Sequence, residues 1–181
     1  MSLSVIIDLV RNPKTVRTKP FVARVNLENG SIEFLKPAVP AYRKGVLVEG
    51  EYLVNPGDLL IIRKDVSSRG HSDQYYILAR VEANGELKEL AWIRFNDRAP
   101  QFSDEKLKEI YATTNGERRV VRALIRYAKE VAAQAQSEEE VLKRCLAEVM
   151  SVLEKYHDKL SSNPVFKKIY SEVKGFMGER V

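Results

Sequence analysis

The chain has 181 residues, of which 44% are hydrophobic and 30% charged, and its formal net charge is +5. A chain of this length forms one large domain or two small ones, and its core needs no disulfide or metal. The composition excludes intrinsic disorder, which combines low hydrophobicity with high net charge. The modest positive charge favours a polyanionic partner but does not identify one.

The first ten residues, MSLSVIIDLV, contain an apolar run that is too short for a signal peptide and is interrupted by Asp8. No later apolar run approaches the ~18 residues that a membrane span requires. These features predict a cytoplasmic protein that does not enter a membrane. The single cysteine, Cys145, shares a helical pattern with Leu142 and Leu146, so it is expected to be a buried thiol.

The first 97 residues alternate between apolar and polar positions, as about seven β-strands would. The pairs Asn29–Gly30 and Asn84–Gly85 each join two such runs. Both pairs predict two-residue type I′ hairpins, because Asn-Gly accepts the positive φ that this turn needs at both positions. The resulting registers pair Val25 with Phe34, Arg80 with Glu89, and Ile77 with Trp92.

Two further strands are expected at residues 46–54 and 58–63, joined by a type II turn that contains Pro56 and Gly57. The segment LKPAVPAY, residues 35–42, holds two prolines and is predicted to be an extended crossover rather than a strand. From Pro100 onward the period is helical. Capping residues predict four helices there. Ser103 caps one that runs to 111, Thr114 opens one at 115–136, and Ser137 opens one at 137–160. The last opens at Asn163–Pro164 and ends at Gly175.

The sequence therefore predicts the α+β class, with an N-terminal antiparallel small sheet or partly open β-barrel followed by a C-terminal bundle of three to four helices. The change of pattern separates a β-rich region, 1–97, from an α-helical region, 98–181. Several strands are apolar on both faces, so other elements must pack on each face of the sheet. We expect the helices to cover one of these faces, so that both regions pack as one α+β unit.

A basic stripe is predicted on the helix that follows residue 114. At ~100° per residue, its cations fall within about a third of the circumference, and apolar residues occupy the other side. Like charges one turn apart repel each other, so the stripe should face an anionic neighbour. That neighbour is either a phosphate backbone or an acidic surface such as residues 138–140, within the chain or across an oligomer. The cations are Arg118, Arg119, Arg122, Arg126 and Lys129.

A second basic segment, residues 11–24, contains five cations and no acidic residue. Prolines break this segment, and an extended cation-rich chain suits contact with phosphates, although a solvated loop has the same composition. The polyanion hypothesis gains if both basic segments lie on one side of the molecule and fails if they lie on opposite sides. The cations of the second segment are Arg11, Lys14, Arg17, Lys19 and Arg24.

Exposed aromatic side chains on the sheet would strengthen a nucleic-acid hypothesis, because bases stack on them. The candidates are Tyr42, Tyr52, Tyr75, Tyr76 and Trp92. The loop at residues 65–73 is either a polar turn or a weaker anion site formed by backbone N–H groups and side chains. Its candidate residues are Ser67, Ser68, Arg69 and His71.

Enzyme chemistry finds little support, and no catalytic residue, metal or cofactor is predicted, because His71 and His157 lie in different regions. The leading hypothesis is a non-enzymatic nucleic-acid-binding or accessory protein that uses the basic helix face. The alternative is a structural or protein-interaction module whose basic stripe docks on an acidic surface, within the chain or through self-association. The high charge content and the four glutamines are compatible with a thermophilic source.

Overall fold

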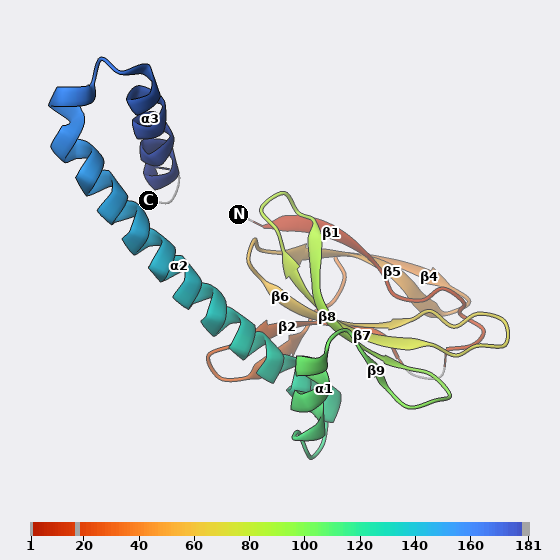
Figure 1. Ribbon diagram of the computed structural model, residues 1–181. Coiled ribbons are helices and arrows are strands. Elements are labelled where there is room, and N and C mark those ends of the chain that lie inside the picture. Colours follow the sequence, from red (N-terminus) through yellow and green to blue (C-terminus); the bar gives the residue numbers. More distant parts are fainter. Residues whose placement is uncertain (1, 17–18, 179–181) are drawn as a thin grey trace. The chain divides into compact units, whose positions relative to one another are not determined.

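A computed structural model describes residues 2–16 and 19–178, with the side chains of these residues outside 132–140. The chain divides into two compact units, Met1–Lys129 (unit 1) and Glu130–Val181 (unit 2). Nine strands and two helix segments belong to unit 1, and a helical hairpin forms unit 2 (Figure 1). No helix of the described residues is long and apolar enough to cross a membrane.

The strands of unit 1 form two antiparallel sheets, and the α+β class is confirmed. One sheet has the order β1-β5-β4 and the other the order β3-β2-β6-β7-β8-β9; neither is closed into a barrel. The strands are β1 (Leu3–Asp8), β2 (Phe21–Asn26), β3 (Ser31–Phe34), β4 (Val39–Arg43), β5 (Val46–Val54), β6 (Leu59–Asp65), β7 (Gln74–Val81), β8 (Leu87–Phe95) and β9 (Gln101–Phe102).

The six-stranded sheet carries buried residues on both faces. One face packs on the three-stranded sheet through a core that includes Val22, Leu60 and Tyr52. The opposite face carries buried Ala23 and Leu78. Helix α1 (Glu105–Ala112) and the first turns of helix α2 (Arg119–Leu160) lie on this second face, where Tyr111 contacts Phe102 and Arg118 contacts Phe34.

The two Asn-Gly hairpins have wider turns than predicted. Of the described residues other than glycine, only Lys44 and Arg118 have positive φ, so neither Asn29 nor Asn84 forms a type I′ turn. The Asn26 side chain accepts the N–H of Glu28 at 2.9 Å and supports a four-residue loop, which shifts Phe34 opposite Ala23. The two consecutive positive-φ residues that a type I′ turn requires are instead Lys44 and Gly45, between β4 and β5.

The pairing of β7 with β8 contains a β-bulge. Ile77 lies opposite Trp92 as predicted, but the register shifts between Leu78 and Ala79. Arg80 therefore pairs with Lys88 rather than with Glu89. The extra residue on β8 accounts for the shift, because a bulge sets two residues against one.

The segment predicted to be a crossover contains a strand instead. β4 is exposed along its whole length and lies at the edge of the three-stranded sheet, where Pro40 is tolerated because it needs no ladder N–H. The turn after β5 is confirmed: Gly57 has φ of +86°, and the N–H of Asp58 donates to the carbonyl of Asn55 at 3.1 Å.

The helices of the described chain number three, and several predicted caps are wrong. Asp104, not Ser103, caps α1 by accepting the N–H of Leu107, while the Ser103 hydroxyl accepts the N–H of Trp92 in β8. The break expected at Ser137 is also wrong, because α2 continues through it with no glycine or proline between residues 119 and 160. The cap at Asn163 is confirmed: its side chain accepts the N–H of Val165.

Unit 2 is the hairpin formed by the C-terminal part of α2 and by α3 (Pro164–Gly178), which does not end at Gly175 as predicted. The His157 ring lies 4.9 Å from that of Tyr170 and 6.2 Å from that of Phe166. Cys145 is exposed, so the prediction of a buried thiol is wrong. Cys145 lies instead on the side of α2 that α3 leaves exposed.

Candidate nucleic-acid interface

The five predicted stripe residues lie together at the start of α2, and we call them the basic cluster. Arg118 precedes the helix with φ of 53°, and Arg119 is its first residue. Val121, Leu124 and Ile125 occupy the buried side, so the apolar half of the predicted amphipathic pattern is present. The cations lie near the C-terminal end of α1, not on a bare helix surface.

Two arginines of the cluster donate to the end of α1. Arg119 donates from Nε and Nη2 to the carbonyl of Tyr111, at 3.2 and 2.8 Å, and its guanidinium lies 3.9 Å from the centre of the Tyr111 ring. Arg126 Nη1 donates to the carbonyl of Ile110 at 3.2 Å and to the hydroxyl of Thr114 at 2.8 Å. The carbonyls at a helix C-terminus carry partial negative charge. They interact favourably with these two guanidinium groups and reduce the repulsion between the like charges of the cluster.

The other cations of the cluster are less constrained. Arg122 Nη1 donates to the carbonyl of Asn115 at 3.0 Å. Lys129 is exposed, and its Nζ lies beside Gly30. A Cβ atom at position 30 would be 3.5 Å from this Nζ.

A pocket of about 380 Å³ adjoins the cluster, with the tip of the β2–β3 hairpin on one side and the end of α1 on another. Arg122 and Arg126 engage described protein groups through Nη1 only, so further guanidinium donors remain. The lining has three cations and no carboxylate, so it suits an anion. It consists of Gly30, Thr113, Thr114, Asn115, Arg122, Ile125, Arg126 and Lys129.

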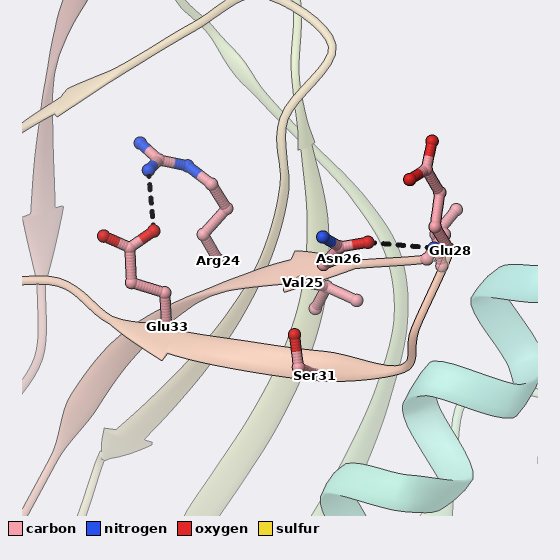
Figure 2. Close-up of a pocket in the computed structure, with 7 residues that line it drawn as sticks. Arg24, Val25, Asn26, Glu28, Ser31 and Glu33 are labelled. Atoms are coloured by element: carbon pink, nitrogen blue, oxygen red, sulfur yellow. Dashed lines mark hydrogen bonds and ion pairs between the residues drawn. The ribbon is translucent and has the colours of Figure 1, made fainter.

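The second basic segment is dispersed. Arg24 lies on β2 and pairs with Glu33 at 3.1 Å and with Asp58 at 3.0 Å. Figure 2 shows the pair with Glu33 in a pocket of about 440 Å³ that Glu28 also lines. Two carboxylates in its lining make this pocket unsuited to phosphate, and Arg24 is already neutralised.

The remaining described cations of that segment precede β2. Lys14 and Lys19 are exposed before β2, Arg11 adjoins Lys64 and Asp73, and Arg17 lies outside the described residues. The hairpin tip at Gly30, beside Lys129, follows β2, and a six-residue strand is roughly 20 Å long. The structure therefore does not bring Lys14 and Lys19 to the Lys129 end of the cluster.

The loop predicted as a weak anion site is a tight turn. The backbone groups of Ser68 and His71 bond to each other, at 2.9 and 3.0 Å, and the N–H of Ser67 donates to the Asp65 carboxylate at 2.9 Å. These N–H groups are therefore not free for an anion. Arg69 is exposed at the tip.

A row of aromatic rings crosses the face of the six-stranded sheet that carries the helices, and we call it the aromatic row. It comprises Phe34 on β3, Phe21 on β2, Tyr76 on β7 and Phe95 on β8. The ring centres are 5.3 Å apart for Phe34 and Phe21, 6.3 Å for Phe21 and Tyr76, and 5.9 Å for Tyr76 and Phe95. Each contact is edge-to-face, the geometry that aromatic pairs prefer.

Arg63 on β6 fills the gap in this row between Phe21 and Tyr76. It is only 4% exposed, its guanidinium lies 5.3 Å from the centre of the Tyr76 ring, and its Nε donates to the Tyr76 hydroxyl at 3.0 Å. At the other end, the Arg118 guanidinium lies 5.5 Å from the centre of the Phe34 ring. Phe34 is 53% exposed, so the row meets the basic cluster at an open ring.

Sequence reasoning found one ring of this row, Tyr76. Of the other candidates, Tyr52 is core, Tyr42 is exposed on β4, and Tyr75 contacts Trp92 on the opposite face of the sheet. The contact between Phe21 and Tyr76, which joins the two ends of the row, was missed because β2 pairs with β6 across a long connection. Only that pairing places Phe21, Arg63 and Tyr76 side by side.

No protein-family model, curated protein or solved structure matches the chain. Among the described residues, no group of three or more His, Cys, Asp or Glu side chains could hold a metal ion.

Proposed function

We propose that the protein binds single-stranded nucleic acid, with bases stacked on the aromatic row and phosphates held by the basic cluster. The observation that carries this proposal is the meeting of the two features at Phe34 and Arg118. Proteins that bind single strands combine a cationic path for the backbone with aromatic rings for the bases.

The geometry of the cluster supports a path for the phosphates. Arg118 contacts Phe34 at the end of β3, and Lys129 lies beside Gly30 just before the start of that strand. The cluster therefore follows the β3 edge of the sheet, from the open ring of the aromatic row to the basic pocket. A single strand whose bases leave the row at Phe34 meets successive cations along this edge.

Stacking on the row favours unpaired bases, because the bases of a duplex already stack on each other and expose no ring face. The row reads no base edge, so weak sequence preference is expected. Arg119 and Arg126 contribute charge while their hydrogen bonds to α1 hold the surface in place.

The docking hypothesis stays a prediction. The acidic run at residues 138–140 lies outside the described side chains, so no contact with the basic cluster can be assigned to it. The carbonyls at the end of α1 already satisfy part of the cluster's positive charge.

The test is fluorescence anisotropy of labelled oligo(dT), oligo(U) and a DNA duplex at about 50 and about 200 mM salt, a range over which several phosphate contacts change affinity by orders of magnitude. We expect both single strands to bind more tightly than the duplex. Phe34→Leu keeps an apolar side chain but removes the ring, and it should weaken binding roughly 5- to 150-fold, which corresponds to one lost stack. Phe34→Tyr should bind as the wild type does.

Two further variants separate stacking from charge. Arg118→Asn removes the cation and keeps a residue that tolerates positive φ, and it should lower the slope of log affinity against log salt by about one. Tyr42→Leu, at an exposed ring on the other sheet, should change nothing. Absence of binding at low salt would refute the proposal, and equal losses from Phe34→Leu and Tyr42→Leu would refute the role of the row.

A further inference from the structure

Unit 2 has an apolar side that nothing in its own hairpin covers. Of the described large apolar residues in unit 2, two are buried, Met150 and Phe166, whereas nine are more than two-fifths exposed. The exposed set comprises Val141, Leu142, Val149, Val152, Tyr156 and Leu160 on α2, and Val165, Ile169 and Phe176 on α3.

Most of these residues directly precede one that packs inside the hairpin. On α2, Val149 precedes buried Met150 and Val152 precedes half-buried Leu153. On α3, Val165 precedes buried Phe166, and Ile169 precedes half-buried Tyr170. Each helix thus has two adjacent apolar stripes, of which only one faces the other helix.

The two outer stripes lie on the same side of the hairpin. One step back along an α-helix is a rotation of about 100°. The two helices run in opposite directions and contact each other from opposite sides, so this rotation turns both stripes toward the same side. The hairpin therefore presents one apolar surface two helices wide, which is half of a four-helix bundle.

We propose that a second copy of this chain covers this surface, with α2 packed antiparallel on α2 of the second copy. The outer stripe of α2 has heptad spacing: Leu142, Val149 and Tyr156 at the first core position, and Cys145 and Val152 at the second. In an antiparallel pair, the first core position of one helix lies opposite the second core position of the other. Val149 then meets Val152 of the second copy, and small Cys145 meets large Tyr156 of the second copy.

Charge complementarity selects a second copy as the occupant. The positions that flank the first core position are Glu148 and Lys155, seven residues apart and both exposed. In the register that pairs Val149 with Val152, Glu148 lies beside Lys155 of the second copy, and the two-fold axis repeats the pair. One helix thus carries both halves of a matched charge pair, which an isologous interface requires.

The assembly depends on unit 2 alone and does not rest on nucleic-acid binding. The α3 helices would pack on each other through Val165, Ile169 and Phe176, across the same two-fold axis. Polar and small residues such as Ala147, Ser151 and Glu154 would remain on the outside. The expected species is a dimer.

The test is sedimentation equilibrium of the full chain over about 1 to 100 μM, because dimer formation follows mass action. The wild type should have twice the mass of one chain. Val149→Glu should give a monomer with unchanged far-ultraviolet circular dichroism, since Val149 is exposed within the hairpin. Ala147→Glu, which adds the same charge on the exposed outer side of α2, should remain dimeric.

Charge reversal tests the register. Glu148→Lys and Lys155→Glu each turn both of the symmetry-related charge pairs of the dimer into like-charge pairs. Each variant should therefore raise the dimer dissociation constant by roughly 2- to 30-fold. The double variant should recover wild-type affinity. A chain that is monomeric throughout, or a dimer that Val149→Glu leaves intact, overturns the proposal. Single reversals without effect, or a double variant weaker than both, overturn the antiparallel pairing of α2.

Discussion

The two units of this chain solve the burial of apolar surface differently. Unit 1 has a sheet with two apolar faces, and the same unit supplies a cover for each: a second sheet on one side, α1 and the start of α2 on the other. Unit 2 has a hairpin with two apolar stripes on each helix and a cover for only one of them. The comparison teaches that one part of a chain can cover its own apolar surfaces while another part leaves an apolar surface exposed.

The units also differ in how their helices are fixed. In unit 1, α1 and α2 are joined by polar contacts: Arg126 binds the end of α1, and the Tyr127 hydroxyl donates to the Asp104 carboxylate at 2.7 Å. In unit 2, ring contacts join the two helices instead: His157 of α2 contacts Phe166 and Tyr170 of α3, and these two rings contact each other. Hydrogen bonds fix the relative orientation of two helices, because they depend on direction. Apolar contacts depend little on direction and constrain the orientation less.

The largest expected effect is a difference in unfolding free energy between alanine substitutions at two leucines of α2. Leu124→Ala, at a fully buried site in unit 1, should lower the free energy of unfolding by about 2–5 kcal/mol. Leu142→Ala, at a site 43% exposed in unit 2, should change it by no more than about 0.5 kcal/mol when the protein is dilute. Urea titrations followed by Trp92 fluorescence for unit 1, and by circular dichroism for the helices, measure both. Equal losses of unfolding free energy for Leu124→Ala and Leu142→Ala in dilute solution would contradict the contrast between the units.

A smaller effect is expected at the polar joint between α1 and α2. Arg126→Ala removes a charged donor to the Ile110 carbonyl and the Thr114 hydroxyl, and it should cost about 1.5–3 kcal/mol in thermal or urea unfolding. Arg126→Lys should recover only part of the loss, because an ammonium lacks the planar fork of a guanidinium. Lys129→Ala is the matched control and should be nearly neutral. A loss at Lys129 equal to that at Arg126 would mean that charge, not the contact, is what matters.

The smallest effect concerns Tyr127. Burial, together with the hydrogen bond to Asp104 and its negative charge, raises the pKa of Tyr127 to about 12. The folded state thus holds this proton more tightly than the unfolded chain, whose tyrosines have a pKa near 10, so stability is lost as pH rises from about 10 to about 12. Tyr127→Phe should cost about 1 kcal/mol at pH 7. In urea titrations the deficit should shrink above pH 10, and a constant deficit would contradict this explanation.

The parts of the fold that local pattern decides were predictable. The bounds of β5, the turn at Gly57 and the cap at Asn163 follow from alternation, from Pro-Gly geometry and from a side-chain acceptor next to a proline. The sites that failed are those where a side chain had two possible partners. Ser103 bonds to Trp92 instead of capping α1, and Thr114 donates to the carbonyl of Ile110 instead of opening α2.

The candidate site was predictable only in part. Helical spacing places the basic cluster on one side of α2, and the cluster is there. What spacing cannot show is that the end of α1 lies against it, because this depends on the turn at residues 113–118, where Gly116 has φ of +92° and Arg118 has φ of 53°. The aromatic row needs the pairing of β2 with β6, which a long connection separates, and no local signal encodes that pairing.

The edge strand β4 bears on how this protein avoids unwanted association. A bare sheet edge offers unpaired N–H and C=O groups on which strands of other molecules can grow, the first step toward fibres. Pro40 removes one donor from this edge, and a bulge between Ala41 and Tyr42 distorts what remains. The exposed β4 is thus a poor template for cross-β growth, even though its surface includes Val39 and Tyr42.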